Sequence, residues 1–319
     1  MRRHWISGAA GLAAAAGLGV AYAAGVEVRN FVVRREQIAC LPPGHPPIRV
    51  LHISDLHLTP SQTTKIGWIR SLAGLEPDLV VDTGDNIAHR DAVPVLIDAL
   101  GELLDVPGVF VPGSNDYFEP SLRNPVKYLL PDDGRRHTDK PMLPWPQMHE
   151  VFRRRGWHDL TNDVATIDLL GTSLGFAGVD DPHLERDDLN VLAEAATDVD
   201  LRIGVTHAPY LRVLDAFADE GFDLTFAGHT HGGQLCLPFI GALVTNCDLD
   251  TDRAKGLHRH PADSHPLDLN STWLHVSAGA GTSPYAPVRF FCRPEATLVT
   301  LAPMEVGRVR TPVRDVVNL

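Results

Sequence analysis

The sequence predicts an α/β fold in which buried strands alternate with helices around a sheet. Short apolar runs recur along the chain, helical patterns separate several of them, and most of the runs end in glycine or a polar residue. Apolar runs of about four to eight residues bounded by turn residues are typical of buried strands. Alternation of such strands with helices indicates helical layers packed on a sheet. The 319 residues, of which 44% are hydrophobic, suffice for one large domain or two small ones.

Seven of the apolar runs predict strands. In chain order they are residues 48–54, 78–84, 109–113, 201–207, 222–228, 273–279 and 296–301, and the last has the character of an edge strand. Apolar residues at helical spacing predict helices over 91–104 and 208–221. The segment 119–146 is rich in proline and holds the charged run DDGRRHTDK, so we expect a surface loop or lid over one end of the sheet.

The first 28 residues differ from the rest of the chain. Two arginines precede residues 5–26, which carry no charged side chain. About 20 apolar residues are enough to cross a bilayer as a helix, so we predict a single-pass anchor in the cell membrane, with the rest of the chain on the outer face. The same stretch fits a secretory signal with a cleavage-like Ala-Tyr-Ala site at 21–23, which would give a secreted protein instead.

Composition also predicts the boundaries of the remaining segments. Residues 29–46 are predicted to be a linker, because the run LPPGHPP at 41–47 contains too much proline for a helix. Residues 47–303 hold the alternating pattern and are predicted to form the folded domain. Residues 304–319 are predicted to be a C-terminal tail in which no chemistry is evident.

The charge and the cysteines exclude some kinds of site. The formal net charge is −12, and an acidic chain is a poor candidate for sequence-independent binding to nucleic acid, which depends on Lys and Arg pairing with phosphates. We therefore expect no nucleic-acid partner. The four cysteines show no Cys-x-x-Cys spacing, which disfavours a zinc ribbon, and they fit four buried thiols about as well as two disulfides.

Residues of the types that bind metals follow five of the predicted strands, at the point where each strand ends. They are Asp55, His57, Asp85, Asn115, His207, His229 and His231. In open α/β sheets the ligand crevice lies beyond the carboxyl ends of the strands, so residues far apart in the sequence can converge there. Imidazole and carboxylate ligands together suit zinc, iron or manganese. The sequence therefore predicts a metal site at this edge of the sheet.

Seven ligands are too many for one ion and suit two. Two divalent ions about 3.5–4 Å apart can hold a nucleophilic water and both oxygens of an in-line displacement at phosphorus. The ions would bring four positive charges, Asp55 and Asp85 would return two negative charges, and a bridging hydroxide would leave the site weakly positive. This balance favours an anionic phosphate ester as the substrate.

The motifs that hold these residues are DLH, GDN, GSND, THAP and GHTHGGQ. Each motif is weak alone, but the ordered set resembles the motif series of the calcineurin-like metallophosphoesterases, and the last motif resembles their bacterial, membrane-associated branch. The likeness covers roughly residues 47–303. It implies a two-sheet β-sandwich flanked by helices, with layers αββα. It also implies a phosphoester hydrolase in which a metal-activated hydroxide attacks phosphorus in line.

The resemblance implies a role for each predicted ligand. The first ion would be bound by Asp55, His57 and His231. The second ion would be bound by His207 and His229, and Asp85 would bridge the two. The two divalent ions would be zinc, manganese or iron.

The third motif departs from the family pattern. The family has Gly-Asn-His followed by Asp or Glu, in which the Asn binds metal and the His protonates the leaving group, whereas this chain has Gly113-Ser114-Asn115-Asp116. An amide oxygen is a far better ligand than a neutral hydroxyl, so we expect Asn115 to coordinate the second ion. The alternative is that Asn115 fills the vacant proton-donor position. In either case Asp116, a histidine such as His89, or a good leaving group would make up for the missing acid.

Four glycines beside the motifs are predicted to contact the substrate, because a backbone without side chains can approach a phosphate closely. They are Gly232, Gly233, Gly279 and Gly281. The sequence thus predicts a dimetal phosphoesterase held at a membrane and acting on a lipid-linked or envelope phosphate ester. The alternative is a metal-binding scaffold or sensor protein of the same fold without turnover, which the missing motif histidine favours.

Overall fold

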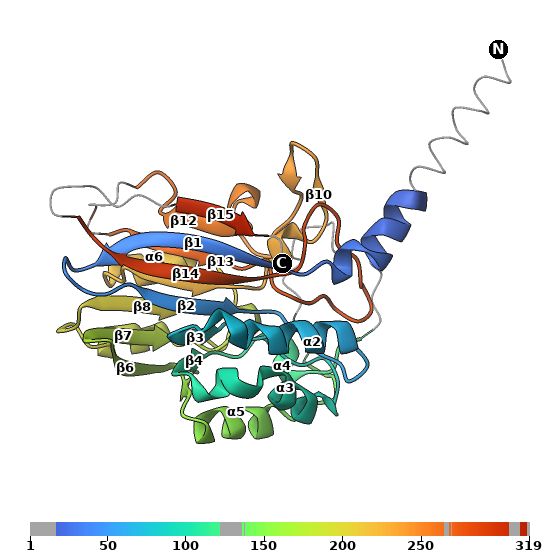
Figure 1. The fold of residues 1–319 in the computed structure, drawn as a ribbon, viewed down its shortest axis with the longest axis horizontal. Coiled ribbons are helices and arrows are strands. Elements are labelled where there is room, and N and C mark those ends of the chain that lie inside the picture. Colours follow the sequence, from blue (N-terminus) through green and yellow to red (C-terminus); the bar gives the residue numbers. More distant parts are fainter. Residues whose placement is uncertain are drawn as a thin grey trace, which may run out of the picture.

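The computed structural model describes residues 17–121, 136, 138–264, 268 and 270–305, together with the backbone of 313–317. Its centre is a sandwich of two sheets, with helices α2, α3 and α5 along one side (Figure 1). The two-sheet architecture with flanking helices that the motif series implies is therefore confirmed.

The first sheet contains seven strands in the order β15-β1-β14-β2-β3-β4-β5. Strands β2 to β5 run parallel to one another, whereas β14 is antiparallel to β2. Strand β1 is parallel to β14 and antiparallel to β15. The bounds are β1 Val32–Leu41, β2 Ile48–Ile53, β3 Leu79–Asp82, β4 Gly108–Phe110, β5 His158–Asp159, β14 Glu295–Pro303 and β15 Val313–Val317.

The second sheet contains six strands in the order β12-β13-β9-β8-β7-β6. Its four inner strands are parallel, and β12 and β6 add antiparallel edges. The bounds are β6 Asp163–Leu169, β7 Thr172–Gly178, β8 Leu201–Val205, β9 Leu224–Ala227, β12 Gly256–His260 and β13 Thr272–Val276. A separate two-stranded hairpin is formed by β10 Cys236–Leu237 and β11 Gly241–Ala242.

Short helices connect the strands. The α-helices are α2 Thr63–Ser71, α3 Ala92–Leu100, α4 Ser114–Tyr117, α5 Trp145–Arg154 and α6 Leu211–Asp219. The 3-10 helices are η1 Glu27–Arg29, η2 Leu72–Leu75, η3 Gly101–Asp105, η5 Pro182–Leu184, η6 Leu189–Glu194, η7 His231–Gly233 and η8 Thr251–Arg253. Residues 17–25 are also helical.

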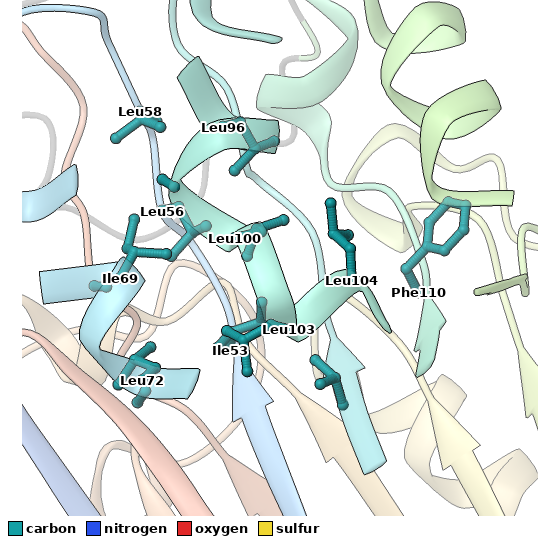
Figure 2. Close-up of a cluster of buried hydrophobic side chains, with 14 of the residues drawn as sticks. Ile53, Leu56, Leu58, Ile69, Leu72, Leu96, Leu100, Leu103, Leu104 and Phe110 are labelled. Carbon is teal, nitrogen blue, oxygen red and sulfur yellow. The ribbon is translucent and has the colours of Figure 1, made fainter. Parts of the chain in front are cut away.

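The inner strands are continuously apolar because both of their faces are buried. In β2, Val50 packs between the two sheets, whereas Leu51 and Ile53 pack against the helices on the outer face. Successive side chains of a strand point to opposite faces, so a strand covered on both sides needs apolar residues at every position. Figure 2 shows the outer core under α2 and α3, where Leu56 and Ile69 lie near Leu100.

All seven predicted strands and both predicted helices are present, with boundaries moved by a few residues. The edge character predicted for residues 296–301 is wrong, because β14 lies between β1 and β2. Eight strands of the described residues lack a counterpart among the predictions: β1, β5, β6, β7, β10, β11, β12 and β15. Most of these lie at sheet edges, where one face meets water and the apolar run is interrupted.

The linker predicted for residues 29–46 is wrong over most of its length. Residues 32–41 form β1, an inner strand of the first sheet. Val33 belongs to the outer core, and Ile38 belongs to the core between the sheets. The charged residues in the middle of β1 hide this strand in the sequence, and the structure pairs one of them, Arg34, with Glu295 of β14.

Three of the predicted segments fall partly outside the described residues. Residues 1–16 of the predicted anchor, 122–135 and 137 of the predicted loop, and 306–312 and 318–319 of the predicted tail lie outside them. Within the described part of the chain, no helix is both long enough and apolar enough to cross a membrane. The predicted loop ends earlier than expected because α5 begins at Trp145, and residues 313–317 of the tail form β15.

Candidate metal centre

Five loops bring the predicted ligands together at the carboxyl ends of the inner strands of both sheets. The loops after β2 and β3 are joined by hydrogen bonds from the Asp55 amide to the Gly84 carbonyl and from the His57 amide to the Asp85 carbonyl, both 2.8 Å. The two sheets meet where the His229 amide donates to Asp55 Oδ2 at 3.0 Å. Residues separated by most of the chain therefore share one small region.

Six of the predicted ligands form a tight cluster, which we call the ligand cluster: Asp55, His57, Asp85, His207, His229 and His231. Asp55, His57 and His231 place one ligand atom each within 4.8 Å of one another, and Asp55, Asp85 and His207 do the same. Oδ2 of Asp85 lies 3.4 Å from Nε2 of His57 and 3.5 Å from Nε2 of His207. Asp85 thus stands between the two predicted halves of the site.

The ligands of the second half are oriented by bonds to backbone carbonyls. Nδ1 of His207 donates to the Thr83 carbonyl at 2.7 Å, and Nε2 of His229 donates to the Asn246 carbonyl at 3.1 Å. The other ring nitrogens, Nε2 of His207 and Nδ1 of His229, face each other at 3.3 Å. Carbonyl partners of this kind fix the tautomer and orientation of metal-binding histidines.

Two atoms of the first half have no hydrogen-bond partner among the described residues, although both are buried. They are Oδ1 of Asp55 and Nε2 of His57. The second oxygen of Asp55 is occupied, because it accepts bonds from the Ser54 hydroxyl at 2.6 Å and from the His229 amide. Buried polar atoms without partners are rare and call for a bound group. The mixed set of carboxylates and imidazoles fits borderline divalent ions such as zinc, manganese or iron.

Burial keeps three of the imidazoles uncharged. It lowers the pKa of His57 to about 4 and holds the pKa values of His229 and His231 well below their usual range. These rings are therefore neutral near pH 7 and can donate a lone pair to a metal, which protonated rings cannot do.

Asp85 and His207 form a charged pair within the ligand cluster. Burial opposes ionisation of Asp85, but His207 and His57 outweigh it and hold the pKa of Asp85 well below its usual range. Burial would lower the pKa of His207, yet Asp85 and Asp55 raise that pKa well above its usual range. Burial raises the pKa of Asp55 to about 6. The cluster therefore attracts positive charge between its two halves.

The backbone is strained at five of the six cluster residues. Positive φ angles occur at Asp55 (50°), His57 (41°), Asp85 (58°), His229 (67°) and His231 (50°). Residues other than glycine rarely adopt this left-handed conformation, and each instance costs on the order of 1–3 kcal/mol. Such strain is typical of functional sites, where the surrounding structure holds side chains in a required geometry.

Two glycines in the motifs allow the ligand loops to touch. A Cβ atom at Gly228 would lie 2.0 Å from the Ser54 hydroxyl, and a Cβ atom at Gly113 would lie 2.3 Å from Oδ1 of Asp85. Any larger residue would push these loops apart. The glycines of the GHTH and GSND motifs therefore serve close packing of the site.

The four glycines predicted to contact substrate are also tightly packed. A Cβ atom at Gly279 would lie 2.5 Å from the Cβ of Asp55, and one at Gly281 would lie 2.3 Å from the Leu56 carbonyl. Added atoms at Gly232 and Gly233 would meet neighbouring side chains at 2.8 and 2.3 Å. Packing alone explains these glycines, and their contact with substrate stays a prediction.

Asn115 lies against the bridging position. Its backbone amide donates to Oδ1 of Asp85 and its side-chain amide donates to Oδ2, both at 2.7 Å. Ser114 makes only a long contact of 3.4 Å with the Asn115 side chain. The structure therefore brings Asn115, rather than Ser114, to the metal side of the loop, and its coordination of the second ion stays a prediction.

The substitution Asn115→Ala tests that ligand role by metal content. If Asn115 holds the second ion, the purified variant should retain one ion per chain, because Asp55, His57 and His231 still hold the first. Ser114→Ala is the matched control and should retain two ions. Two ions in Asn115→Ala, measured by inductively coupled plasma mass spectrometry, would refute the ligand role.

Asp116 has a structural position instead of the predicted catalytic one. Its carboxylate is fully buried and accepts four backbone amides, from Asp85 at 2.8 Å, Asn86 at 2.7 Å, Ile87 at 3.2 Å and Gly113 at 3.0 Å. These bonds occupy both oxygens, so we correct the expectation that Asp116 acts as proton donor. The other candidate donor, His89, is exposed and accepts a bond from the Asp91 amide at 3.1 Å.

One buried arginine near the site was not predicted from the sequence. The Arg289 guanidinium donates to the carbonyls of Ala278 at 2.7 Å, Gly279 at 3.0 Å and Gly281 at 2.6 Å, and it lies 3.4 Å from Nδ1 of His231. It thereby holds the glycine-rich turn after β13 against the first half of the cluster. A single arginine in an apolar run gives no sequence signal for this role.

A second group that was not predicted follows β7. His183 lies with its ring centroid 4.9 Å from that of His229, and its Nδ1 is 3.1 Å from the Tyr210 hydroxyl. Asp181 caps this turn by accepting the His183 amide at 3.2 Å. Asp181 and His183 follow the carboxyl end of β7, as the predicted ligands follow the carboxyl ends of their own strands. They were missed because β7 itself was not predicted.

Comparison with known proteins agrees with this geometry. A family model described as calcineurin-like phosphoesterase matches residues 48–233. The metallophosphoesterase YkuE of Bacillus subtilis is 26% identical over 94% of this chain and 97% of its own length. The phosphodiesterase YaeI of Escherichia coli is 25% identical over 94% of this chain and 98% of its own length. The UDP-2,3-diacylglucosamine pyrophosphatase LpxG of Chlamydia trachomatis is 26% identical over 79% of this chain and 83% of its own length.

The similar solved structures share less sequence with this chain. A 5'-nucleotidase precursor from Thermus thermophilus has 10% sequence identity and a TM-score of 0.38, covering 82% of this chain and 56% of its own. The purple acid phosphatase PPD1 of yellow lupin has 12% identity and a TM-score of 0.38, covering 86% and 48%.

Proposed function

This chain belongs to the calcineurin-like phosphoesterase family, and we propose that it hydrolyses phosphate esters with two divalent ions held by the ligand cluster. The observation that supports this most directly is the position of Asp85 between His57 and His207, beside buried ligand atoms of Asp55 and His57 that have no hydrogen-bond partner among the described residues. The family membership supports a hydrolase, and the cluster supplies the chemistry that such a hydrolase needs.

Each cluster residue has a distinct task in this proposal. Asp55, His57 and His231 would hold one ion, His207 and His229 the other, and Asp85 would touch both. When bound, the ions supply Lewis acidity toward phosphate oxygens and activate water as the nucleophile. The chain holds its ligands in place beforehand through Thr83, Asn246 and Ser54, so little reorganisation is needed when substrate binds.

Protonation of the leaving group is the step for which this chain lacks the usual residue. Asn115 lies at the bridging carboxylate and, as an amide, can donate a hydrogen bond but cannot transfer a proton. We therefore expect a preference for esters or anhydrides whose leaving groups are stable as anions. A phosphoanhydride, as cleaved by a pyrophosphatase, meets this requirement.

A lipid-linked substrate at a membrane is the finer part of the proposal. The relative LpxG is named for a diacylated nucleotide sugar, which joins a phosphoanhydride to acyl chains. The uncharged stretch at residues 5–26 supports a location at the membrane. We propose that the present chain acts on a substrate of the same general class, with the phosphate group at the ligand cluster.

Turnover by metal-reconstituted full-length protein tests the function. Bis(p-nitrophenyl) phosphate, p-nitrophenyl phosphate and UDP-2,3-diacylglucosamine form a suitable panel. Zinc, manganese or iron should restore hydrolysis of at least one of them after chelation, and chelation should lower the melting temperature because ions that bind only the folded state stabilise it. Stoichiometric metal binding without turnover of any ester would favour the alternative, a metal-binding scaffold or sensor.

A further inference from the structure

The exposed apolar side chains of the described residues are concentrated in three segments. Ten of the twelve large hydrophobic residues that are exposed there lie in these segments. We call the ten the apolar rim: Leu18, Val20, Tyr22 and Val26 of the N-terminal helical segment, Leu237, Phe239, Ile240 and Leu243 of the β10–β11 hairpin, and Tyr285 and Phe291 of the loop before β14. Single exposed apolar residues are ordinary, but a concentration of this kind marks an interaction surface.

The three segments are connected to one another. The Arg289 amide donates to the Ala23 carbonyl at 3.2 Å, which joins the loop to the N-terminal helical segment. The Cys236 amide donates to the Phe290 carbonyl at 2.8 Å, and the Phe290 amide donates to the Gln234 carbonyl at 3.1 Å, which joins the loop to the hairpin. In Figure 1 the helical segment and the hairpin both project beyond the sheets at the upper right.

The chemistry of the rim points to lipid. Residues 235–244 carry no charge, and neither do residues 17–26 of the described helical segment, so two uncharged stretches lie in one region. At the tip of the hairpin Phe239 is fully exposed and Ile240 is 65% exposed. Aromatic residues such as Tyr22 and Tyr285 suit the boundary between headgroups and acyl chains, because they combine an apolar ring with a polar end.

We propose that the apolar rim is a membrane-contact surface, in which the tip of the β10–β11 hairpin inserts into the interfacial region of a lipid bilayer. A bilayer is favoured over a second protein copy because the loop before β14 is hydrogen-bonded to both the hairpin and the N-terminal helical segment, so the rim combines two uncharged, apolar segments. The contact is hydrophobic, since a chain of net charge −12 gains nothing from anionic headgroups as a whole. Insertion should therefore occur on zwitterionic lipid and resist salt.

The rim places the bilayer beside the ligand cluster. The hairpin follows directly after His231, Gly232 and Gly233, and the segment that leaves it supplies the Asn246 carbonyl that holds His229. A phosphoester whose acyl part stays in the bilayer would thus reach the cluster from the membrane surface. This last consequence rests on the proposed function, whereas insertion of the hairpin does not.

A fluorescent probe on the hairpin tests insertion directly. Full-length protein with Phe239→Cys is labelled with an environment-sensitive fluorophore and reconstituted into phosphatidylcholine vesicles that contain nitroxide-labelled lipid. The matched control is Leu170→Cys, which labels an exposed residue of the β6–β7 turn outside the rim. The unsubstituted chain, labelled in the same way, corrects for its own cysteines. We expect a blue shift and nitroxide quenching at 239 that persist in high salt, and neither effect at 170.

The results that would overturn the proposal are equally direct. A probe at 239 that stays unquenched, while the protein is in the vesicles, shows that the hairpin remains in water. A blue shift that depends on protein concentration and not on lipid shows that the rim binds a second copy instead.

A double substitution at the hairpin separates membrane contact from catalysis. Phe239→Asp with Ile240→Asp should lower turnover of a vesicle-borne ester by about tenfold or more. The double variant loses the favourable free energy of moving two apolar side chains from water into the bilayer, so less protein is bound at the membrane surface. Hydrolysis of a soluble ester should be unchanged, as in Leu170→Asp. Equal rates on vesicle-borne ester in both variants would contradict the proposal. Absence of turnover of every ester, soluble or vesicle-borne, in the unsubstituted protein would contradict only the proposed function, since probe quenching still reports insertion.

Discussion

Asp85→Ala is expected to abolish nearly all turnover and to remove much of the bound metal. Asp85 lies 3.4 Å from His57 and 3.5 Å from His207, so its loss weakens both halves of the cluster. Turnover should fall by at least about 100-fold, because loss of an outer-shell partner alone typically costs about 10–100-fold. Metal analysis and steady-state kinetics on the same preparation measure both effects.

The control for this result is Asp98→Ala. Asp98 is an exposed carboxylate on the surface of α3 that pairs with Arg70 at 2.6 Å. Its loss should leave metal content and rate unchanged, since exposed ion pairs contribute little. Two bound ions and a normal rate in Asp85→Ala would show that Asp85 is not the bridging residue.

Asp116→Ala is expected to destabilise the fold strongly. Four buried backbone amides lose their acceptor, and each buried donor without a partner costs on the order of 1–3 kcal/mol, although water can replace part of the loss. We expect the free energy of unfolding to fall by about 3 kcal/mol or more. Urea denaturation of metal-free protein measures the change without interference from metal binding.

The same measurement separates the structural role of Asp116 from a catalytic one. A proton donor could be replaced with little effect on unfolding and a large effect on rate. Asp116→Asn should have an intermediate effect on stability, because its amide oxygen can still accept some of the four bonds while its amino group opposes the others. Unchanged stability in Asp116→Ala together with lost turnover would restore the catalytic interpretation.

The inner strands and the ligand set could be predicted because their signals are local. An inner strand buried on both faces is apolar at every position, as in β2 and β3, and this pattern is visible without knowledge of its neighbours. The ligands follow such strands directly, and parallel strands present their carboxyl ends at one edge of a sheet. The convergence of Asp55 with His231 therefore follows from strand order and residue type.

Other features depend on partners distant in the sequence. Strand β1 contains Arg34, Arg35 and Glu36, which alone suggest a solvent-exposed connector, and only the pairing of β1 with β14 explains why these residues lie in a sheet. Asp116 is a carboxylic acid in the position where its motif predicts a catalytic one. The four backbone amides that bond to it belong, however, to the loop after β3 and to Gly113. Arg289 likewise holds the turn after β13 through bonds to the Ala278 and Gly281 carbonyls, and these partners are visible only in the folded structure.

By itself, the sequence determined the layered α/β class, the family resemblance and the identities of the six cluster residues, because those rest on residue type, spacing and periodicity along the chain. The tertiary structure decided which residues serve the site indirectly, such as Asp116, Arg289 and the packed glycines. It also decided that exposed residues from both ends of the chain adjoin one hairpin beside the cluster. The physical reason is that burial, hydrogen-bond partners and surface patches are properties of contacts between distant segments, and no local pattern encodes them.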